Sequence, residues 1–151
     1  MARKVPRWIA VLSIVGVLAV FSWVVQAAAP DKPVRDGVFI HVTKGVEHPH
    51  EVLMALRMAE IMAPDRDVIL YFDIKGVEVV LKDAPDLRHK PFANSHAALT
   101  ALMGNGVTVC ACPGCLAAAG KSADDLRAGV TVADKDRFFS FTKGRVLTLD
   151  Y

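Results

Sequence analysis

The chain has 151 residues, of which 53% are hydrophobic and 23% are charged, so it can bury the core of one globular domain and has little room for two. Its formal net charge of +2 includes three basic residues within the first seven positions, and without them 15 basic residues face 16 acidic ones. A near-neutral domain has little electrostatic basis for binding nucleic acid, so we exclude that class of partner.

Residues 1–29 have the composition of an export signal. Three basic residues precede an uncharged apolar stretch, residues 8–25, and three alanines end the segment at 27–29. About 18 apolar residues also approach the length of a membrane-spanning helix, so the segment is either a cleaved signal peptide or an uncleaved anchor whose membrane contact is residues 8–25. Both alternatives place the domain in the periplasm or another extracytoplasmic space. Residues 30–36 are a short linker, and the domain proper is 37–151.

The first two thirds of the domain alternate between strand and helix patterns. Runs of β-branched and aromatic residues predict strands at 37–42, 67–74 and 107–111. Apolar residues at helical spacing predict helices over 46–62 and 95–103, with Pro49 in the first turn of the former. Residues 76–81 fit either a strand or a helix, and residues 82–92 are a polar loop.

The last third continues the alternation with shorter elements. A helix is expected from Cys112 to Gly120, and Ser122 with Asp125 resembles a capping box that opens a short helix to about residue 128. The remaining runs are 130–132, 137–142 and 145–149, and the last is expected to be an edge strand. The pattern predicts an α/β fold in three layers: a mostly parallel sheet with helices on both faces, doubly wound and Rossmann-like, with the site in the strand-end loops.

All three cysteines lie between positions 110 and 115, so they cannot join distant parts of the fold and instead indicate a local chemical site. Cys112 follows a strand and begins a helix, where unpaired backbone N–H groups favour a thiolate. Cys115 lies on the same side of the first helical turn, so the two sulfurs could form a disulfide, resolve a persulfide or share a metal. Cys110 alternates within the strand and is expected to be buried.

Other interpretations of the Cys112 and Cys115 pair are weaker. A thioredoxin-like reductase carries such a motif after its first strand, whereas here it follows the third. A purely structural disulfide would close so short a loop that it adds little stability through loop entropy. A zinc site needs two further ligands, and although His41, His48 and His50 are candidates, no second CxxC or HxxxH is present.

We therefore expect no metal and no cofactor. Two further histidines, His89 and His96, carry no functional signal.

Three segments in this order and spacing resemble the DsrE/DsrF-like family: residues 39–45, 68–77 and 106–116, followed by Gly120 and residues 126–130. The resemblance extends over residues 37–151. The family includes the sulfur-relay proteins TusD and DsrE. It implies that a persulfide-carrying cysteine stands eight residues before a glycine, which Cys112 and Gly120 match. It also implies a resolving role for Cys115 and a homo- or hetero-oligomer.

The expected function is that of an exported sulfur-handling protein, a sulfurtransferase-like sulfur carrier if it is active. Cys112 would carry sulfane sulfur as a persulfide, Cys115 would release it or protect Cys112 as a disulfide, and the partners would be donor and acceptor proteins or small sulfur species. The export segment departs from the well-known relay proteins, which are cytoplasmic. Two alternatives stay open: a metal or small-ligand module using both cysteines and a first-strand histidine, and a non-catalytic subunit of a redox complex.

Overall fold

The computed structural model describes residues 33–151, and the export segment predicted at 1–29 lies outside this part of the chain. Its elements in chain order are β1 (Gly37–Val42), α2 (Pro49–Met62), β2 (Asp67–Phe72), the 3-10 helix η1 (Gly76–Val80), α3 (Ser95–Gly104), β3 (Thr108–Ala111), α4 (Pro113–Ala118), the 3-10 helix η2 (Ala123–Asp125), β4 (Thr131–Val132), α5 (Lys135–Ser140) and β5 (Val146–Asp150). Over this described part, none of the helices combines the length and the apolar character needed to cross a membrane.

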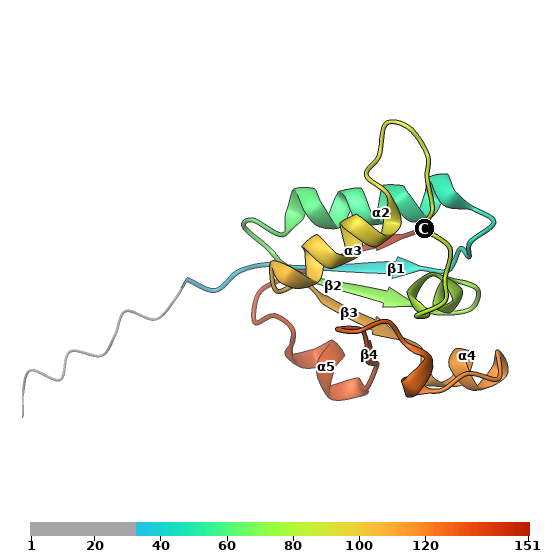
Figure 1. Cartoon of the computed structure of the whole chain (residues 1–151). Helices are drawn as coiled ribbons and strands as arrows, with labels where there is room; N and C mark the ends of the chain where they lie inside the picture. The colour runs from blue at the N-terminus through green and yellow to red at the C-terminus, as the bar shows by residue number, and fades with distance from the viewer. Residues whose placement is uncertain (1–32) are drawn as a thin grey trace, which may run out of the picture. The chain divides into compact units, whose positions relative to one another are not determined.

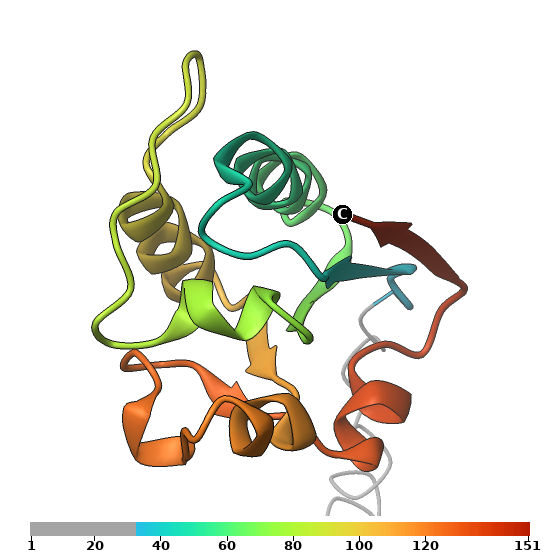
Figure 2. The ribbon, with the colours of Figure 1, turned by 90° about the vertical axis from the view of Figure 1, so that its right-hand side faces the viewer.

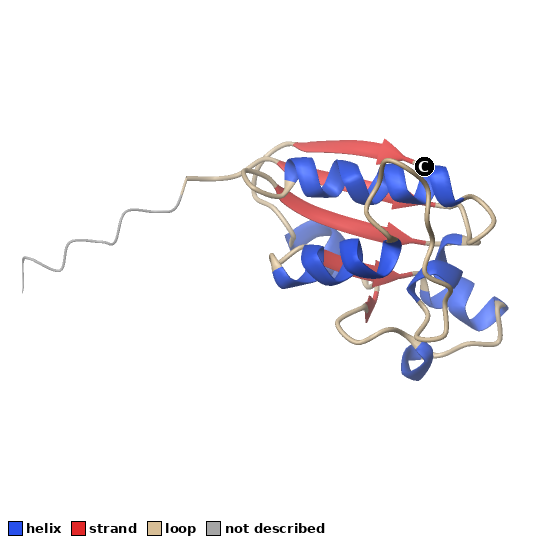
Figure 3. Cartoon of the chain, turned by 45° about the horizontal axis from the view of Figure 1, so that its top comes forward, coloured by secondary structure: helices blue, strands red, loops and turns tan. Residues whose placement is uncertain are grey.

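The five strands form one parallel sheet in the order β4-β3-β2-β1-β5. The strand arrows of Figure 3 accordingly point to one edge of the sheet. From β1 to β4 the chain crosses the sheet in one direction, and β5 then returns to the far side of β1. Because parallel crossovers are right-handed, this reversal puts α2 and α3 on one face and α5 on the other (Figure 1). The predicted α/β class with helices on both faces is confirmed, and β5 is an edge strand as expected.

The main core lies between the sheet and helices α2 and α3. Alternate residues of the central strands point to this face, among them Ile40, Leu70 and Phe72, all fully buried. From α2, Leu53 and Leu56 meet them and are equally inaccessible to solvent. The two central strands are apolar on both faces, and α2 has one apolar stripe. Packing the helix on the sheet therefore removes the most apolar surface from water.

A second, smaller apolar cluster covers the opposite face under α5. Ile69 and Cys110 have no exposed surface there, and the rings of Phe138 and Phe141 pack against them. The prediction that Cys110 is buried in its strand is therefore confirmed. Burial also raises the pKa of Cys110 to about 12, so this thiol keeps its proton.

Several predicted boundaries shift in the structure. Helix α2 begins at Pro49, three residues after the expected start, because a proline suits the first helical position where no N–H partner is needed. The ambiguous segment 76–81 is mostly the 3-10 helix η1, and the short helix expected to reach residue 128 is only η2. Its capping box is confirmed, since the Asp125 carboxylate accepts hydrogen bonds from the Ser122 N–H at 2.9 Å and hydroxyl at 3.2 Å.

The run at 137–142 lies mostly in helix α5. Asp134 begins that helix by accepting the N–H of Arg137 at 2.9 Å.

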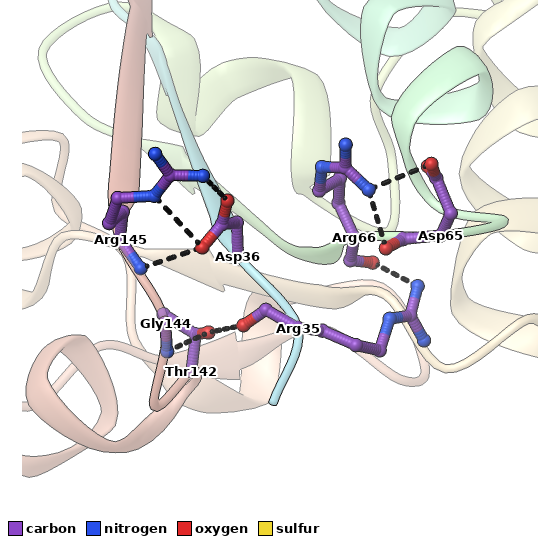
Figure 4. A network of polar contacts seen from close by, with 7 residues as sticks. All are labelled: Arg35, Asp36, Asp65, Arg66, Thr142, Gly144 and Arg145. Atoms are coloured by element: carbon purple, nitrogen blue, oxygen red, sulfur yellow. Dashed lines mark hydrogen bonds and ion pairs between the residues drawn. The ribbon is translucent and has the colours of Figure 1, made fainter. Parts of the chain in front are cut away.

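A polar network joins the amino-terminal edge of β1 to the segments that enter β2 and β5 (Figure 4). The Arg35 guanidinium donates to the carbonyl of Arg66 at 2.6 Å, and the Thr142 hydroxyl donates to the carbonyl of Arg35 at 2.7 Å. The Asp36 carboxylate accepts the N–H of Arg145 at 3.0 Å and its guanidinium at 2.6 Å. These hydrogen bonds hold the pKa of Asp36 below its usual value. The network fixes how β5 pairs with β1. It lies at the amino-terminal ends of the strands, whereas the cysteines lie at the carboxyl ends.

Gly76 allows the start of η1 to lie directly against the end of β1. Its N–H donates to the carbonyl of Thr43 at 3.1 Å, and a Cβ at this position would collide with the carbonyl oxygen of Val42. Only glycine permits this approach of two backbones. The same turn carries Asp73 and Ile74, so Gly76 fixes the position of both.

Replacing Gly76 with alanine is expected to lower the free energy of unfolding by about 1–3 kcal/mol, because the turn must move away from β1. Urea denaturation followed by circular dichroism measures the change. Gly104→Ala is the matched control, since a Cβ at this last residue of α3 has nothing within 4 Å, and it is expected to gain up to about 1 kcal/mol. Equal effects of the two substitutions would contradict the close-approach argument.

Candidate functional site

Cys112 lies at the junction between β3 and α4. Its N–H donates to the carbonyl of Phe72 in the neighbouring β2 at 2.8 Å, which continues the sheet pairing to the cysteine. Its own carbonyl accepts the N–H of Leu116 at 3.0 Å as the first hydrogen bond of α4, with Pro113 as the first helical residue. Figure 2 looks onto this carboxyl edge of the sheet, where α4 and η1 lie in front. The predicted position of Cys112 between a strand and a helix is confirmed.

The Cys112 sulfur is partly buried and receives several hydrogen bonds. The N–H of Cys115 donates to it at 3.3 Å, and the side chains of Tyr71 and Cys115 act as hydrogen-bond donors that lower the pKa of Cys112. Burial by itself would raise the pKa of Cys112, but these hydrogen bonds outweigh it and lower the pKa below that of an ordinary thiol. The surroundings of Cys112 therefore favour the thiolate, which is the nucleophilic form.

Cys115 has the opposite tendency. Burial and the neighbouring sulfur of Cys112 raise the pKa of Cys115, and the charge of Asp73 adds to this. One donor favours its thiolate, because the N–H of Ile74 lies 3.0 Å from the Cys115 sulfur. The site therefore lowers the pKa of Cys112 and raises the pKa of Cys115, so Cys112 is the cysteine that ionises first as the pH rises.

The N–H of Ile74 reaches Cys115 because the backbone of Ile74 is left-handed, with φ at 47°. This conformation is unfavourable for a β-branched residue and costs on the order of 1–3 kcal/mol. The side chain gains little in return, since 62% of its surface is exposed. The strain therefore lies in the turn that supplies a hydrogen bond to one of the two cysteines.

His41 lies between two carboxylates on the face of the sheet that α5 partly covers. Its Nδ1 lies 3.0 Å from Asp150 in β5, and its Nε2 lies 2.9 Å from Asp73, although the second contact lacks the alignment of a hydrogen bond. Its ring stacks on Tyr71, with centroids 5.5 Å apart and planes inclined by 19°. Partial burial would lower the pKa of His41, but the two carboxylates outweigh it and raise the pKa. The ring thus remains cationic to a higher pH than an ordinary histidine.

An open hollow of about 390 Å³ lies beside Cys115. Apolar groups from Ile74, Ala118 and Ala119 form much of its lining, and an ion pair between Lys75 and Glu78 at 2.9 Å stands at the same place. The hollow gives a small molecule or a thiol-bearing segment access to Cys115.

The remaining histidines named from the sequence have other partners. His50 at the start of α2 stacks on His89 from the polar loop, with ring centroids 4.5 Å apart, and His48 lies 3.4 Å from Glu51. The ring of His96 pairs with the carbonyl of Ala84 at 3.1 Å.

Across residues 33–151, no group of three or more His, Cys, Asp and Glu side chains is arranged to hold a metal ion.

The model of the DsrE/DsrF-like family matches residues 36–145, which is most of the chain. The chain belongs to the DsrE/DsrF-like family. Membership indicates a function related to sulfur relay, and the segments that carried the resemblance in the sequence lie within the matched range. None of the curated proteins compared with the sequence matches it significantly.

Solved structures agree on the fold. The YchN protein from Escherichia coli is 21% identical, with a TM-score of 0.58, and the match covers 76% of this chain and 99% of YchN. MTH1491 from Methanobacterium thermoautotrophicum, described as a protein of unknown function, is 22% identical with a TM-score of 0.51 and the same two coverages. At these identities the likeness establishes the fold alone.

Within this DsrE/DsrF-like domain, the structure brings together Cys112 and Cys115, as the sequence predicted. It adds Tyr71, Asp73 and Asp150, which sequence reasoning missed, and it places His41 in an ion-pair cluster rather than with the cysteines as a metal ligand. A signal was available for Tyr71, because a polar aromatic residue near the end of a buried strand usually has a partner for its hydroxyl.

At neutral pH, Cys112 is expected to react with iodoacetamide roughly three- to tenfold faster than Cys115, and Cys110 is expected to stay unmodified in the folded protein. The rate at Cys112 should rise with a midpoint below that of a free thiol, because the lowered pKa keeps the thiolate present at lower pH. Timed alkylation over a pH series, with the modified residue assigned by fragmentation mass spectrometry, measures this. Preferential modification of Cys115 at neutral pH would contradict the assignment, and Cys112→Ser should remove the reaction that begins at low pH.

Proposed function

We propose that this protein carries sulfane sulfur as a persulfide on Cys112. The observation that supports this most strongly is the position of the partly buried Cys112 sulfur, which accepts the Cys115 N–H at 3.3 Å and whose pKa is lowered by hydrogen bonds from Tyr71 and Cys115. Family membership supports sulfur chemistry in general, and the hydrogen bonds indicate which of the three thiols acts as the nucleophile. The fully buried, protonated Cys110 has neither access nor charge for this role.

Loading requires only a sulfane donor. The Cys112 thiolate attacks the outer sulfur of a donor persulfide, R–S–SH, so that a new S–S bond forms at Cys112 and the donor leaves as its thiolate, R–S⁻. The reaction exchanges one S–S bond for another, and it needs no added oxidant or reductant. Donors and acceptors are therefore thiol-bearing proteins or small sulfur species, and oligomerisation, which is general in this family, would bring such sites together.

Cys115 is suited to end the cycle when no acceptor is present. Its thiolate attacks the Cys112 sulfur of the persulfide, a disulfide forms between the two cysteines, and the outer sulfur leaves as HS⁻. Because the pKa of Cys115 is raised, it keeps its proton and does not compete with Cys112 for the incoming sulfur. The N–H of Cys115 donates to the Cys112 sulfur at 3.3 Å, which keeps the resolving thiol close to the persulfide.

Incubation of the reduced protein with polysulfide is expected to add about 32 Da, one sulfur atom, to Cys115→Ala, whereas the wild type should pass through this gain and end about 2 Da lighter, as the disulfide between Cys112 and Cys115. Cys112→Ala should gain nothing, because the nucleophile is absent. Intact-mass spectrometry before and after a thiol reductant measures the gain and its reversal. Cys110→Ala is the control and should load like the wild type.

If the added mass stayed in Cys112→Ala, or failed to appear in Cys115→Ala, a persulfide on Cys112 would be ruled out. The protein would then be better explained as a subunit whose cysteines take no part in sulfur transfer.

We also infer export, on the composition of residues 1–29 described above. Protein isolated from its own cells is expected in an extracytoplasmic fraction, with a mass that lacks residues 1–27 or 1–29 if the segment is cleaved, and in the membrane with its full mass if it is an anchor. Fractionation followed by intact-mass spectrometry measures both. Full-length protein in the cytoplasmic fraction would contradict export.

A further inference from the structure

Four side chains stand in one row across the sheet face that α5 partly covers. In the parallel register, His41 pairs with Asp150 on one side and with Tyr71 on the other, and Tyr71 pairs with Cys110. Cys112 comes directly after the end of β3, and its N–H donates at 2.8 Å to the carbonyl of Phe72, the residue that follows Tyr71 in β2. The register therefore brings the Tyr71 ring beside the strand end that carries Cys112.

The ring of Tyr71 is held on several sides. His41 stacks on it at 5.5 Å, Phe138 of α5 meets it edge-on at 5.0 Å and 79°, and Phe39 lies at 5.9 Å. A ring held by three others has little freedom to turn, so its hydroxyl stays near the strand end that carries Cys112. Burial and the neighbouring Cys112 also raise the pKa of Tyr71, so the hydroxyl keeps its proton and remains a donor.

His41 is fixed in turn by the two carboxylates that its nitrogens face. One nitrogen, Nδ1, forms a hydrogen bond with Asp150 at 3.0 Å, and Nε2 lies 2.9 Å from Asp73 as an ion pair, so two negative charges flank a ring that they favour as a cation. The resulting cation joins Asp150 in β5 to Asp73 in the turn after β2. Since these carboxylates and Tyr71 are the titratable groups that contact His41, its charge state depends on them.

We propose that the Tyr71 hydroxyl stabilises Cys112 as the leaving thiolate in sulfur transfer, and that His41, held by Asp73 and Asp150, is the positioning residue for the Tyr71 ring. This inference rests on the proposed function and assigns roles within the same site. Tyr71 lies beside the reacting sulfur, whereas His41 acts only through Tyr71.

The step concerned is unloading. The thiolate of an acceptor, R–S⁻, attacks the outer sulfur of the Cys112 persulfide, an S–S bond forms on the acceptor to give R–S–SH, and the bond to Cys112 breaks. The electron pair of that bond remains on the Cys112 sulfur, which becomes a thiolate. A hydrogen bond from Tyr71 that strengthens as this charge develops lowers the barrier.

The first test compares Tyr71→Phe with the parent in full-length protein that carries Cys115→Ala in both arms, so that Cys112 is the accessible thiol. Loss of the hydroxyl is expected to cut the thiolate fraction at neutral pH about tenfold, partly offset by higher intrinsic nucleophilicity, so that alkylation slows by about three- to fourfold. At a pH high enough to ionise Cys112 fully in both the parent and Tyr71→Phe, the order of the alkylation rates should reverse, with Tyr71→Phe about threefold faster. A change of packing alone would not produce crossing pH profiles, so coincident profiles would overturn the role of Tyr71.

The second test concerns His41. In the same Cys115→Ala protein, His41→Gln is expected to slow alkylation of Cys112 at neutral pH by about twofold, because the Tyr71 ring loses its support. When Tyr71→Phe is already present, His41→Gln should have no further effect. The control is His48→Gln, an exposed histidine that contacts Glu51, which should leave the rate unchanged. If His41→Gln slowed the reaction equally with and without the Tyr71 hydroxyl, its charge would act directly on Cys112, and the positioning role would be wrong.

Unloading itself is then measured by single-turnover transfer from the loaded persulfide to a small thiol. Tyr71→Phe is expected to slow this transfer by about tenfold while still accepting sulfur from polysulfide. Circular dichroism confirms that each variant is folded. If the parent took up no sulfur, the proposed function would fail, whereas crossing alkylation profiles would still support the contact between Tyr71 and Cys112. If the parent loaded and Tyr71→Phe unloaded at the same rate, the leaving-group role alone would fail.

Discussion

The site depends on the parallel register that aligns the strand ends at the carboxyl edge of the sheet. His41 and Tyr71 are register partners, and the N–H of Cys112 extends the same pairing by donating to the carbonyl of Phe72. A shift of one residue in any of these strands would turn its side chains to the other face. The ionisation of Cys112 is therefore set by backbone hydrogen bonds of the sheet as much as by its immediate neighbours.

The turn after β2 is the second element on which the site depends, and it is strained. Gly76 lies so close to β1 that no side chain fits, and two residues earlier Ile74 adopts a left-handed conformation that its branched side chain disfavours. In exchange, Asp73 reaches His41 and the N–H of Ile74 reaches the Cys115 sulfur. Strain held at the point where a backbone donor meets a reactive sulfur is typical of a functional turn, because the rest of the fold must supply the energy that maintains it.

The sequence was sufficient for local features and insufficient for long-range ones. The junction at Cys112 and the burial of Cys110 follow from spacing within a few residues, and both agree with the structure. The contact between His41 and Asp150 joins residues 109 positions apart and requires the pairing of β1 with β5, which no local pattern encodes. Helix α5 was missed for a related reason, since it has no fully buried residue of its own and packs on the sheet through the contact of Phe138 with Tyr71.

The opposite ionisation of the two cysteines bears on the proposed export. In an oxidising compartment a lone thiolate is open to oxidation to sulfenic and then sulfinic acid, and the second of these steps is generally irreversible. A neighbouring thiol offers a reversible alternative, the disulfide, which a dedicated reductant can open again. Such a partner must stay protonated while sulfur is being loaded, because two thiolates would compete for it. The raised pKa of Cys115 beside the lowered pKa of Cys112 meets that requirement, so the pair suits a sulfur carrier that works outside the cytoplasm better than either cysteine would alone.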